Sequence, residues 1–313
     1  MVNITKKKTL LAMGVSAGLT LALAACSSGG DPLSSDAPAE ESSGGSIIVG
    51  SADFAESQLL AKIYELALDD IGIDASEKPN IGSREVYITA ITDGSIDLIP
   101  EYNGYLLEKL DPEAEFTDRD QIQESLFENL PENVTVLDYA SAENTNVLVV
   151  TKEFSDEHGG LETISDLAEI DDGTFKLAGP PEWRSRPNTG IPAIRDIYGM
   201  DFENRFEILD GGGPLSLAAV VNGQVEISML FSSDPAISEN NLVALTDDKV
   251  LFPPANILPM IRTDKVDDAI EAQLNKVSEK LVIEDLMEMN GRVNAGDDLT
   301  EIAKDWLTET GII

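Results

Sequence analysis

Short apolar runs alternate with longer segments of helical period over residues 46–313, and this alternation limits the possible folds more than any other feature of the chain. The runs have the four to six residues typical of buried strands, and they lie at 46–51, 96–99, 146–150, 175–178, 227–230 and 242–245. Because helical segments separate these strands, we expect an α/β fold of mostly parallel sheets with helices on both faces.

The helical segments are recognised by apolar residues that return every three or four positions. In the first of them, 56–71, these residues include Leu59, Leu60, Ile63 and Leu66. The others lie at 83–92, 190–198, 215–222, 266–281, 283–290 and 298–310. A folded part of about 270 residues suits two domains of ordinary size or one large one, and a hydrophobic content of 42% is enough for their cores.

The first residues have the pattern of a secretory signal peptide. Lys6, Lys7 and Lys8 precede an uncharged stretch from 10 to 25, which is shorter than the roughly 20 residues that a membrane span needs. The ending Leu23-Ala-Ala-Cys26 resembles a bacterial lipobox. The resemblance implies cleavage after residue 25, lipidation of the Cys26 thiol, and export to the outer face of the cell membrane. A disulfide is excluded because the chain has 1 cysteine.

Residues 26–45 are expected to form a flexible tether between the lipid and the folded part. They are mostly Ser, Gly, Pro, Ala, Asp and Glu, and Leu33 is their single large apolar residue. Such a segment buries too little apolar surface to offset the conformational entropy lost on ordering. The folded part should therefore begin near Ser46.

The chain is strongly acidic, with 58 Asp and Glu against 21 Lys and Arg and a formal net charge of −37. Such a surface repels phosphate backbones, so we expect no nucleic-acid partner. The excess of acids fits attraction of cationic ligands, and it also fits simple solubility in a salty medium, where charges are screened. Because the acids are spread along the whole chain, the sequence favours the second interpretation.

Residues that could carry catalysis are scarce. His158 is the single histidine, and it stands in a polar turn. Without a second histidine or a free thiol, neither a Ser-His-Asp hydrolase nor a zinc site is supported. The run Gly211-Gly-Gly213 lacks the Lys and Ser/Thr of a phosphate-binding loop. We expect no catalytic residue, no metal and no cofactor.

Four loops at predicted strand ends combine an aromatic residue with polar ones. They lie at 51–56, 100–104, 179–187 and 231–235. Open α/β sheets bind ligands at the carboxyl ends of their strands. The loops are therefore candidates for a binding site, although an aromatic residue at such a place more often covers a core than contacts a ligand.

Seven segments resemble, in order, the substrate-binding proteins of osmoprotectant ABC transporters, which bind glycine betaine, carnitine and choline. These segments are GSIDLIPEYNG (94–104), NTNVLVVTK (144–152), TISDL (163–167), IYGMDF (197–202), NGQVE (222–226), FSSD (231–234) and FPPAN (252–256). They are spread over most of the folded part, and their order makes the set far more specific than any one of them.

The resemblance implies a two-lobed periplasmic-binding-protein-like (type II) α/β fold with two crossovers between the lobes. One lobe would comprise 46–144 and 254–313, and the other 145–253. Such a protein closes on its ligand like a hinged clamp. It would be a monomer that hands a small-molecule solute to a membrane permease powered by an ATPase, and it would catalyse no reaction.

The resemblance also suggests ligand-binding residues. A trimethylammonium group is attracted to aromatic faces by cation–π interaction, and Tyr102 matches the tyrosine of the family loop while Trp183 stands where some members have an aromatic residue. A betaine carboxylate prefers Arg or backbone donors, which Arg184 and Arg186 could supply. Further candidates are Asn103, Asn146, Phe54, Phe231, Ser232 and Asp234.

Departures from the family pattern leave the ligand open. Asn146 and Ala255 stand where many betaine binders have tyrosine, and the loop reads Tyr102-Asn-Gly-Tyr105 instead of Tyr-Thr-Gly-Thr. Each lost cation–π contact of about 1 kcal/mol would weaken binding several-fold. The expected ligand is a quaternary ammonium solute such as glycine betaine, choline or carnitine. The alternatives are ergothioneine or an aromatic compound with the same transport role, and a surface hydrolase.

Overall fold

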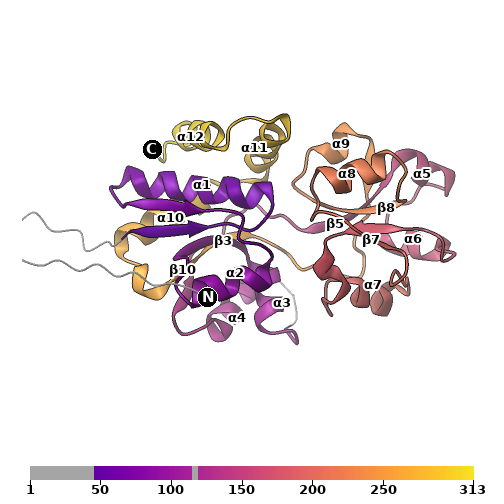
Figure 1. The fold of residues 1–313 in the computed structure, drawn as a ribbon, viewed down its shortest axis with the longest axis horizontal. Coiled ribbons are helices and arrows are strands. Elements are labelled where there is room, and N and C mark those ends of the chain that lie inside the picture. The colour runs from indigo at the N-terminus through magenta and orange to yellow at the C-terminus, as the bar shows by residue number, and fades with distance from the viewer. Residues whose placement is uncertain (1–45, 115–118) are drawn as a thin grey trace, which may run out of the picture. The chain divides into compact units, whose positions relative to one another are not determined.

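The computed structural model describes residues 46–114 and 119–313, which form two five-stranded sheets, each with its own helices (Figure 1). We call each sheet with its helices a lobe. The predicted signal peptide, the predicted lipidation site Cys26 and the predicted tether lie outside the described residues.

Lobe 1 contains both the first and the last elements of the described chain. Its sheet has the order β2-β1-β3-β10-β4. The strands are β1 (Ile47–Gly50), β2 (Ala75–Lys78), β3 (Leu98–Tyr102), β4 (Val134–Val136) and β10 (Ile257–Arg262). The helices are α1 (Ala55–Asp70), α2 (Arg84–Thr92), α3 (Asn103–Leu110), α4 (Arg119–Asn129), α10 (Asp268–Lys280), α11 (Ile283–Ala295) and α12 (Leu299–Glu309), with a short 3-10 turn, η2 (Thr263–Lys265).

Lobe 2 is formed by the middle of the chain. Its sheet has the order β7-β6-β8-β5-β9. The strands are β5 (Asn146–Thr151), β6 (Leu177–Gly179), β7 (Phe206–Ile208), β8 (Ile227–Phe231) and β9 (Leu242–Ala244). The helices are α5 (Lys152–Glu157), α6 (Ile164–Ile170), α7 (Ile191–Tyr198), α8 (Pro214–Val221) and α9 (Ala236–Glu239), with a 3-10 turn, η1 (Pro181–Arg184).

The expectation of mostly parallel sheets is wrong. Strand β1 pairs in parallel with β2 and β3, and β6 pairs in parallel with β7 and β8. Strand β10, however, is antiparallel to β3 and β4, and β5 is antiparallel to β8 and β9. Both antiparallel strands follow a connection from the other lobe. They do not belong to a strand–helix–strand unit, so nothing forces them to run parallel to their neighbours.

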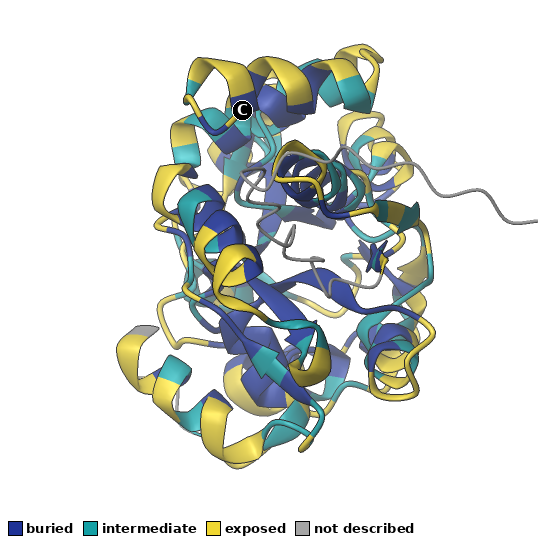
Figure 2. Ribbon diagram, turned by 90° about the vertical axis from the view of Figure 1, so that its left-hand side faces the viewer, coloured by how far each residue is buried: buried dark blue, intermediate teal, exposed yellow. Residues whose placement is uncertain are grey.

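Each lobe has its own hydrophobic core on both faces of its sheet, and Figure 2 shows the strands mostly buried under helices with exposed outer faces. In lobe 1 one face packs under α1, α10 and α12 and the other under α2, α3 and α4. In lobe 2 the two faces pack under α6 with α7 and under α8. No core cluster of the described residues includes side chains of both lobes, so each lobe is a separate packing unit. The lobe limits at 144/145 and 253/254 stay a prediction.

All seven predicted helices are present, and their ends lie within a few residues of those expected, except that α11 continues to Ala295 where the prediction ended at residue 290. Their ends follow ordinary capping rules: the Asp267 and Asp298 side chains accept hydrogen bonds from the first backbone N–H groups of α10 and α12, and Gly199 and Gly296 end α7 and α11 in the left-handed conformation. Within the described ranges, no helix has both the length and the apolar character needed to cross a bilayer.

Candidate functional site

A cavity of about 240 Å³ is lined by residues of both lobes. Lobe 1 contributes the loop after β1, the end of β3 and the start of α2. Lobe 2 contributes the 3-10 turn η1, the segment after β7 and the end of β8. The volume lies just below the range of about 300–1,000 Å³ that is usual for drug-sized ligands, so it suits a small solute.

Six aromatic side chains line the cavity, and they come from both lobes. They are Phe54, Tyr87, Tyr102 and Tyr105 of lobe 1 and Trp183 and Phe231 of lobe 2. The Phe54 ring lies between two others, with its centroid 6.0 Å from that of Tyr102 and 5.2 Å from that of Phe231. The aromatic surface is therefore continuous from one lobe to the other.

Arg84 and Glu101 form an ion pair inside lobe 1. The guanidinium donates from Nε and Nη2 to the two carboxylate oxygens, at 2.6 and 2.9 Å, and the Tyr87 hydroxyl donates to the same carboxylate at 2.8 Å. The Glu101 side chain is fully buried. Burial alone would lower the pKa of Arg84, but the neighbouring Glu101 carboxylate outweighs it and raises the pKa above its usual value. Arg84 therefore stays charged beside the cavity.

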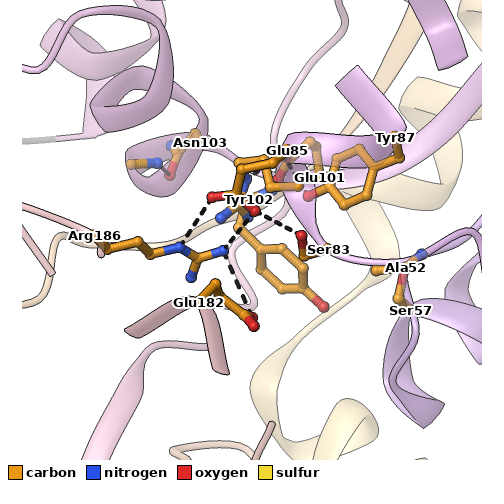
Figure 3. Close-up of polar contacts among 12 residues, drawn as sticks. Ala52, Ser57, Ser83, Glu85, Tyr87, Glu101, Tyr102, Asn103, Glu182 and Arg186 are labelled. Carbon is orange, nitrogen blue, oxygen red and sulfur yellow. Dashed lines mark hydrogen bonds and ion pairs between the residues drawn. The ribbon is translucent and has the colours of Figure 1, made fainter. Parts of the chain in front are cut away.

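A second ion pair joins the two lobes. Arg186 of lobe 2 donates from Nε and Nη2 to the Glu85 carboxylate of α2, at 3.2 and 3.3 Å, and its Nη2 lies 3.8 Å from Glu182 (Figure 3). Burial by itself would raise the pKa of Glu85. The hydrogen bonds from Arg186 and Ser83 outweigh burial and lower that pKa to about 2.

Two tyrosine hydroxyls at the cavity bond to groups near the connections between the lobes. The Tyr102 hydroxyl donates to Glu56 at 2.6 Å, and the Tyr105 hydroxyl accepts the backbone N–H of Asn146 at 2.9 Å. Burial raises the pKa of Tyr105 to about 12, and burial together with the Glu56 carboxylate raises that of Tyr102 well above 10. Both phenols are thus neutral at neutral pH.

Two glycines shape the loops that carry these side chains. A Cβ on Gly104 would lie 2.0 Å from the backbone oxygen of Pro254 in the second connection between the lobes. A Cβ on Gly190 would lie 2.3 Å from the backbone oxygen of Trp183. Neither position has room for a side chain, so the close approach of these backbones depends on glycine.

The structure brings six of the ten predicted ligand-binding residues to this cavity. They are Phe54, Tyr102, Asn146, Trp183, Arg186 and Phe231. Four of them are aromatic, and all but Asn146, which begins β5, come from the four loops that the sequence indicated. Their contact with a ligand stays a prediction.

Arg184 and Asn103 do not line the cavity. The Arg184 guanidinium packs over the Phe206 ring at 5.6 Å and donates to the backbone oxygen of the same residue at 3.3 Å. The Asn103 side chain is fully buried, where its oxygen accepts the backbone N–H groups of Gly104 and Asn256. Asn103 thereby fixes the start of α3 against β10.

Ser232 and Asp234 also lie outside the lining. The Ser232 hydroxyl accepts the backbone N–H of Thr145 at 3.0 Å. The Asp234 carboxylate accepts the backbone N–H of Ala236 and the side-chain amide of Asn294, both at 2.9 Å. Both residues therefore connect the end of β8 to other segments.

Several lining residues were missed by the sequence analysis, notably Arg84, Tyr87, Tyr105 and Asn144. Arg84 and Tyr87 lie on α2, whereas the sequence pattern indicated only loops at strand ends. Tyr105 follows Tyr102 by three residues, almost one turn of α3, and this spacing was a usable signal.

His158 packs in an aromatic cluster away from the cavity. Its ring lies 4.3 Å from that of Phe154 and 5.8 Å from that of Phe175, measured between centroids. Within the residues that the structure describes, no group of His, Cys, Asp and Glu is arranged to hold a metal ion.

Comparisons with known proteins agree with the fold. The family described as "Substrate binding domain of ABC-type glycine betaine transport system" matches residues 45–309. A glycine-betaine-binding protein of Pseudomonas aeruginosa is 27% identical over 280 residues, which cover 83% of this chain and 86% of that protein. The carnitine transport binding protein OpuCC of Listeria monocytogenes is 27% identical over 256 residues, covering 80% of this chain and 81% of that protein.

A solved structure described as a glycine betaine/carnitine/choline ABC transporter shares 22% identity with this chain at a TM-score of 0.67. The match covers 85% of this chain and 99% of that one, and it shows the two-lobed type II periplasmic-binding-protein fold. The family match extends from just before β1 to the end of α12. The chain therefore belongs to the family of substrate-binding domains of ABC-type glycine betaine transport systems, which are solute-binding proteins and not a class of enzymes.

Proposed function

We propose that this protein captures a quaternary ammonium solute of the glycine betaine, choline and carnitine class and delivers it to an ABC permease. Family membership and the names of the two relatives support this ligand class. The receptor itself would catalyse no reaction, and the permease with its ATPase would move the solute across the membrane.

The observation that carries the proposal is the aromatic lining shared by the two lobes. A quaternary ammonium group makes no strong hydrogen bond, and each aromatic face attracts it by about 0.5–2 kcal/mol. Phe54 and Tyr102 on one side and Phe231 on the other offer such faces around a cavity of small-solute size. Tyr87 and Tyr105 add aromatic surface to this lining.

The charges around the cavity also favour a cation. The lining contains three carboxylates, Asp53, Glu182 and Asp210, and two guanidiniums, Arg84 and Arg186. Each guanidinium is already bonded to a glutamate. The field in the cavity is therefore on balance negative, which attracts a positively charged head group.

We propose that the protein closes on its ligand by rotation of the two lobes about the connections near residues 144/145 and 253/254. The separate cores allow each lobe to move as a unit. The Arg186–Glu85 pair joins the lobes beside the cavity, so it would form when the lobes approach and break when they part.

We further propose that the receptor is exported and held at the outer face of the cell membrane by lipid on Cys26. The basic start, the uncharged stretch to residue 25 and the ending Leu23-Ala-Ala-Cys26 support this location. The segment 26–45 would keep a monomeric receptor within reach of its permease.

A thermal-shift screen tests the ligand class. The purified protein is heated with glycine betaine, choline, carnitine, proline betaine, ectoine or ergothioneine. A ligand that binds only the folded protein raises the melting temperature, and we expect a clear rise with glycine betaine, choline or carnitine. A rise with ergothioneine alone would change the ligand but keep the transport role, and no rise with any solute would contradict the proposed function.

Substitution of one aromatic ring tests the site itself. Phe231→Leu keeps the apolar volume but removes the aromatic face, so the affinity for the best solute should fall by about fivefold in calorimetry, the equivalent of about 1 kcal/mol. Phe127→Leu is the matched control, since Phe127 is exposed on α4 and does not line the cavity. Equal affinities in both variants would remove Phe231 from the site.

A further inference from the structure

Glu56, the second residue of α1, is buried and accepts four side-chain hydrogen bonds. Its Oε1 accepts from the Tyr102 hydroxyl at 2.6 Å and from the Asn144 amide at 2.8 Å. Its Oε2 accepts from the Ser233 hydroxyl and from the Asn290 amide, both at 2.6 Å. The side chain thus connects four segments that are far apart in the sequence.

The chemistry of the cluster suits a carboxylate at the position of Glu56. Two carboxylate oxygens offer about four acceptor positions, and all of them face a neutral donor. Hydrogen bonds to an ionised group are about twice as strong as those between neutral groups. An amide in this place would turn an NH₂ group toward two donors, so glutamine cannot reproduce the arrangement although it has the same shape.

The four donors come from both lobes and from a connection between them. Tyr102 ends β3 in lobe 1, and Asn144 lies in the connection from β4 to β5. Ser233 follows β8 in lobe 2, and Asn290 belongs to α11 of lobe 1. Asn290 also donates to the Ser233 hydroxyl oxygen at 3.2 Å. Any rotation of lobe 2 that displaces Ser233 must change the hydrogen bonds of Glu56.

Tyr102 brings this cluster into contact with the cavity. Its ring lines the cavity beside Phe54, while its hydroxyl is bonded to Glu56. Asn144 lines the same cavity. The two donors to Oε1, Tyr102 and Asn144, therefore belong to the lining of the cavity. One donor to Oε2, Ser233, belongs to lobe 2.

We propose that Glu56 is a positioning residue that couples ligand binding to the orientation of the lobes. This inference rests on the proposed function. With Ser233 bonded, Glu56 holds the Tyr102 ring in its place at the cavity. A ligand that packs on this ring then favours the joined arrangement of the lobes, and by linkage the joined lobes bind the ligand more tightly.

A double-mutant cycle on ligand affinity tests the coupling. Tyr102→Phe keeps the ring and removes its bond to Glu56, and Ser233→Ala removes the bond from lobe 2. We expect each substitution to weaken binding of choline or glycine betaine by about tenfold in calorimetry. Because either substitution breaks the same connection, the double variant should also be about tenfold weaker, whereas independent effects would multiply to about a hundredfold.

Two further variants make the test specific. Ser232→Ala changes the neighbouring serine, whose hydroxyl bonds to the backbone of Thr145 and not to Glu56, so its effect should be independent of Tyr102→Phe. Adding Tyr102→Phe or Ser233→Ala to the Glu56→Gln variant should weaken its binding by less than a further twofold. If Glu56→Gln does not fold, the cycle of the two milder variants still decides the question.

Unfolding measured without ligand separates coupling from a merely structural connection. Non-additive effects of Tyr102→Phe and Ser233→Ala on the affinity support the inference. Non-additive effects on the unfolding free energy alone overturn it. Multiplicative losses of affinity also overturn it while the proposed function stands. A wild-type protein that binds neither choline nor glycine betaine, nor any other solute of the screen, overturns the proposed function and this inference with it.

Discussion

Two arginine–glutamate pairs stand at the same cavity, and they differ in what holds them together. Arg84 and Glu101 both belong to lobe 1, and their side chains are 12% and 0% exposed. Arg186 and Glu85 belong to different lobes, and their side chains are 16% and 38% exposed. The first pair is part of the folded lobe, and the second exists only while the lobes are together.

The difference shows that one side of a cavity can be fixed by folding while the other side depends on how the lobes are oriented. Removing one partner of a buried pair leaves a charge without compensation, at a cost of about 3–5 kcal/mol. A partly exposed pair contributes about 0–1 kcal/mol to stability. We therefore expect substitutions in the first pair to change folding and substitutions in the second to change ligand binding.

The largest effect is expected for Glu101→Gln. It removes the charge that faces Arg84 and should lower the unfolding free energy by about 3–5 kcal/mol. Chemical denaturation without ligand measures the change. Glu85→Gln is the matched control and should change stability by less than about 1 kcal/mol. Equal losses in the two variants would show that the pairs do not differ as described.

Arg186→Ala should act on affinity. It removes one of the contacts between the lobes, and we expect the affinity for both choline and glycine betaine to fall by about fivefold, with little change in stability. Calorimetry with the two solutes measures the effect. A much larger loss for glycine betaine, which carries a carboxylate, would show that Arg186 leaves Glu85 to bind the ligand.

A smaller effect should appear on acidification. In the joined lobes the pKa of Glu85 is about 2, and when Arg186 departs it should return toward its ordinary value of 4.5. A lowered pKa stabilises the joined form above pH 4.5, and this contribution is lost as the pH falls from 4.5 through 2. In the wild-type protein the affinity at pH 4 should be about two- to fourfold lower than at pH 7. Any change that Glu85→Gln also shows between these pH values is subtracted first. Fluorescence titrations measure the affinity of both proteins at each pH. If the affinity of the wild-type protein and of Glu85→Gln changed with pH in the same way, this prediction would be contradicted.

The smallest effect is expected for Arg184→Ala. Arg184 lies two residues from Arg186, but it packs on Phe206 and does not line the cavity. Its removal should change the affinity by less than about twofold. A tenfold loss in calorimetry would mean that this part of the site rearranges when the ligand binds.

Much of the fold could be predicted because the central strands are apolar and the long helices have clear periodicity. Strand β2 was missed since its residues, Ala75–Lys78, are mostly polar at the sheet edge. Strand β10 was missed because Pro259 stands in its middle, a position that usually argues against a central strand. In the structure Pro259 faces Pro100 of β3, so two residues without an N–H group are paired.

The site was predictable where it lies at strand ends and not where it depends on packing between elements. Tyr102 and Phe231 follow from their positions at the ends of β3 and β8. Tyr87 looks like an ordinary core residue of α2, and only its bond to Glu101 beside the cavity reveals another role. The Arg186–Glu85 pair joins residues that are 101 positions apart, so no local sequence pattern predicts this ion pair.

The distance between the lobes, with and without ligand, tests the central claim most directly. Spin labels are placed on exposed residues of α4 and α5 by Glu128→Cys and Glu153→Cys in a Cys26→Ser background. We predict that the best solute of the screen shortens and narrows the distance distribution, and that Arg186→Ala needs about fivefold more solute for the same change. An unchanged distribution at saturating solute would contradict a receptor that closes on its ligand.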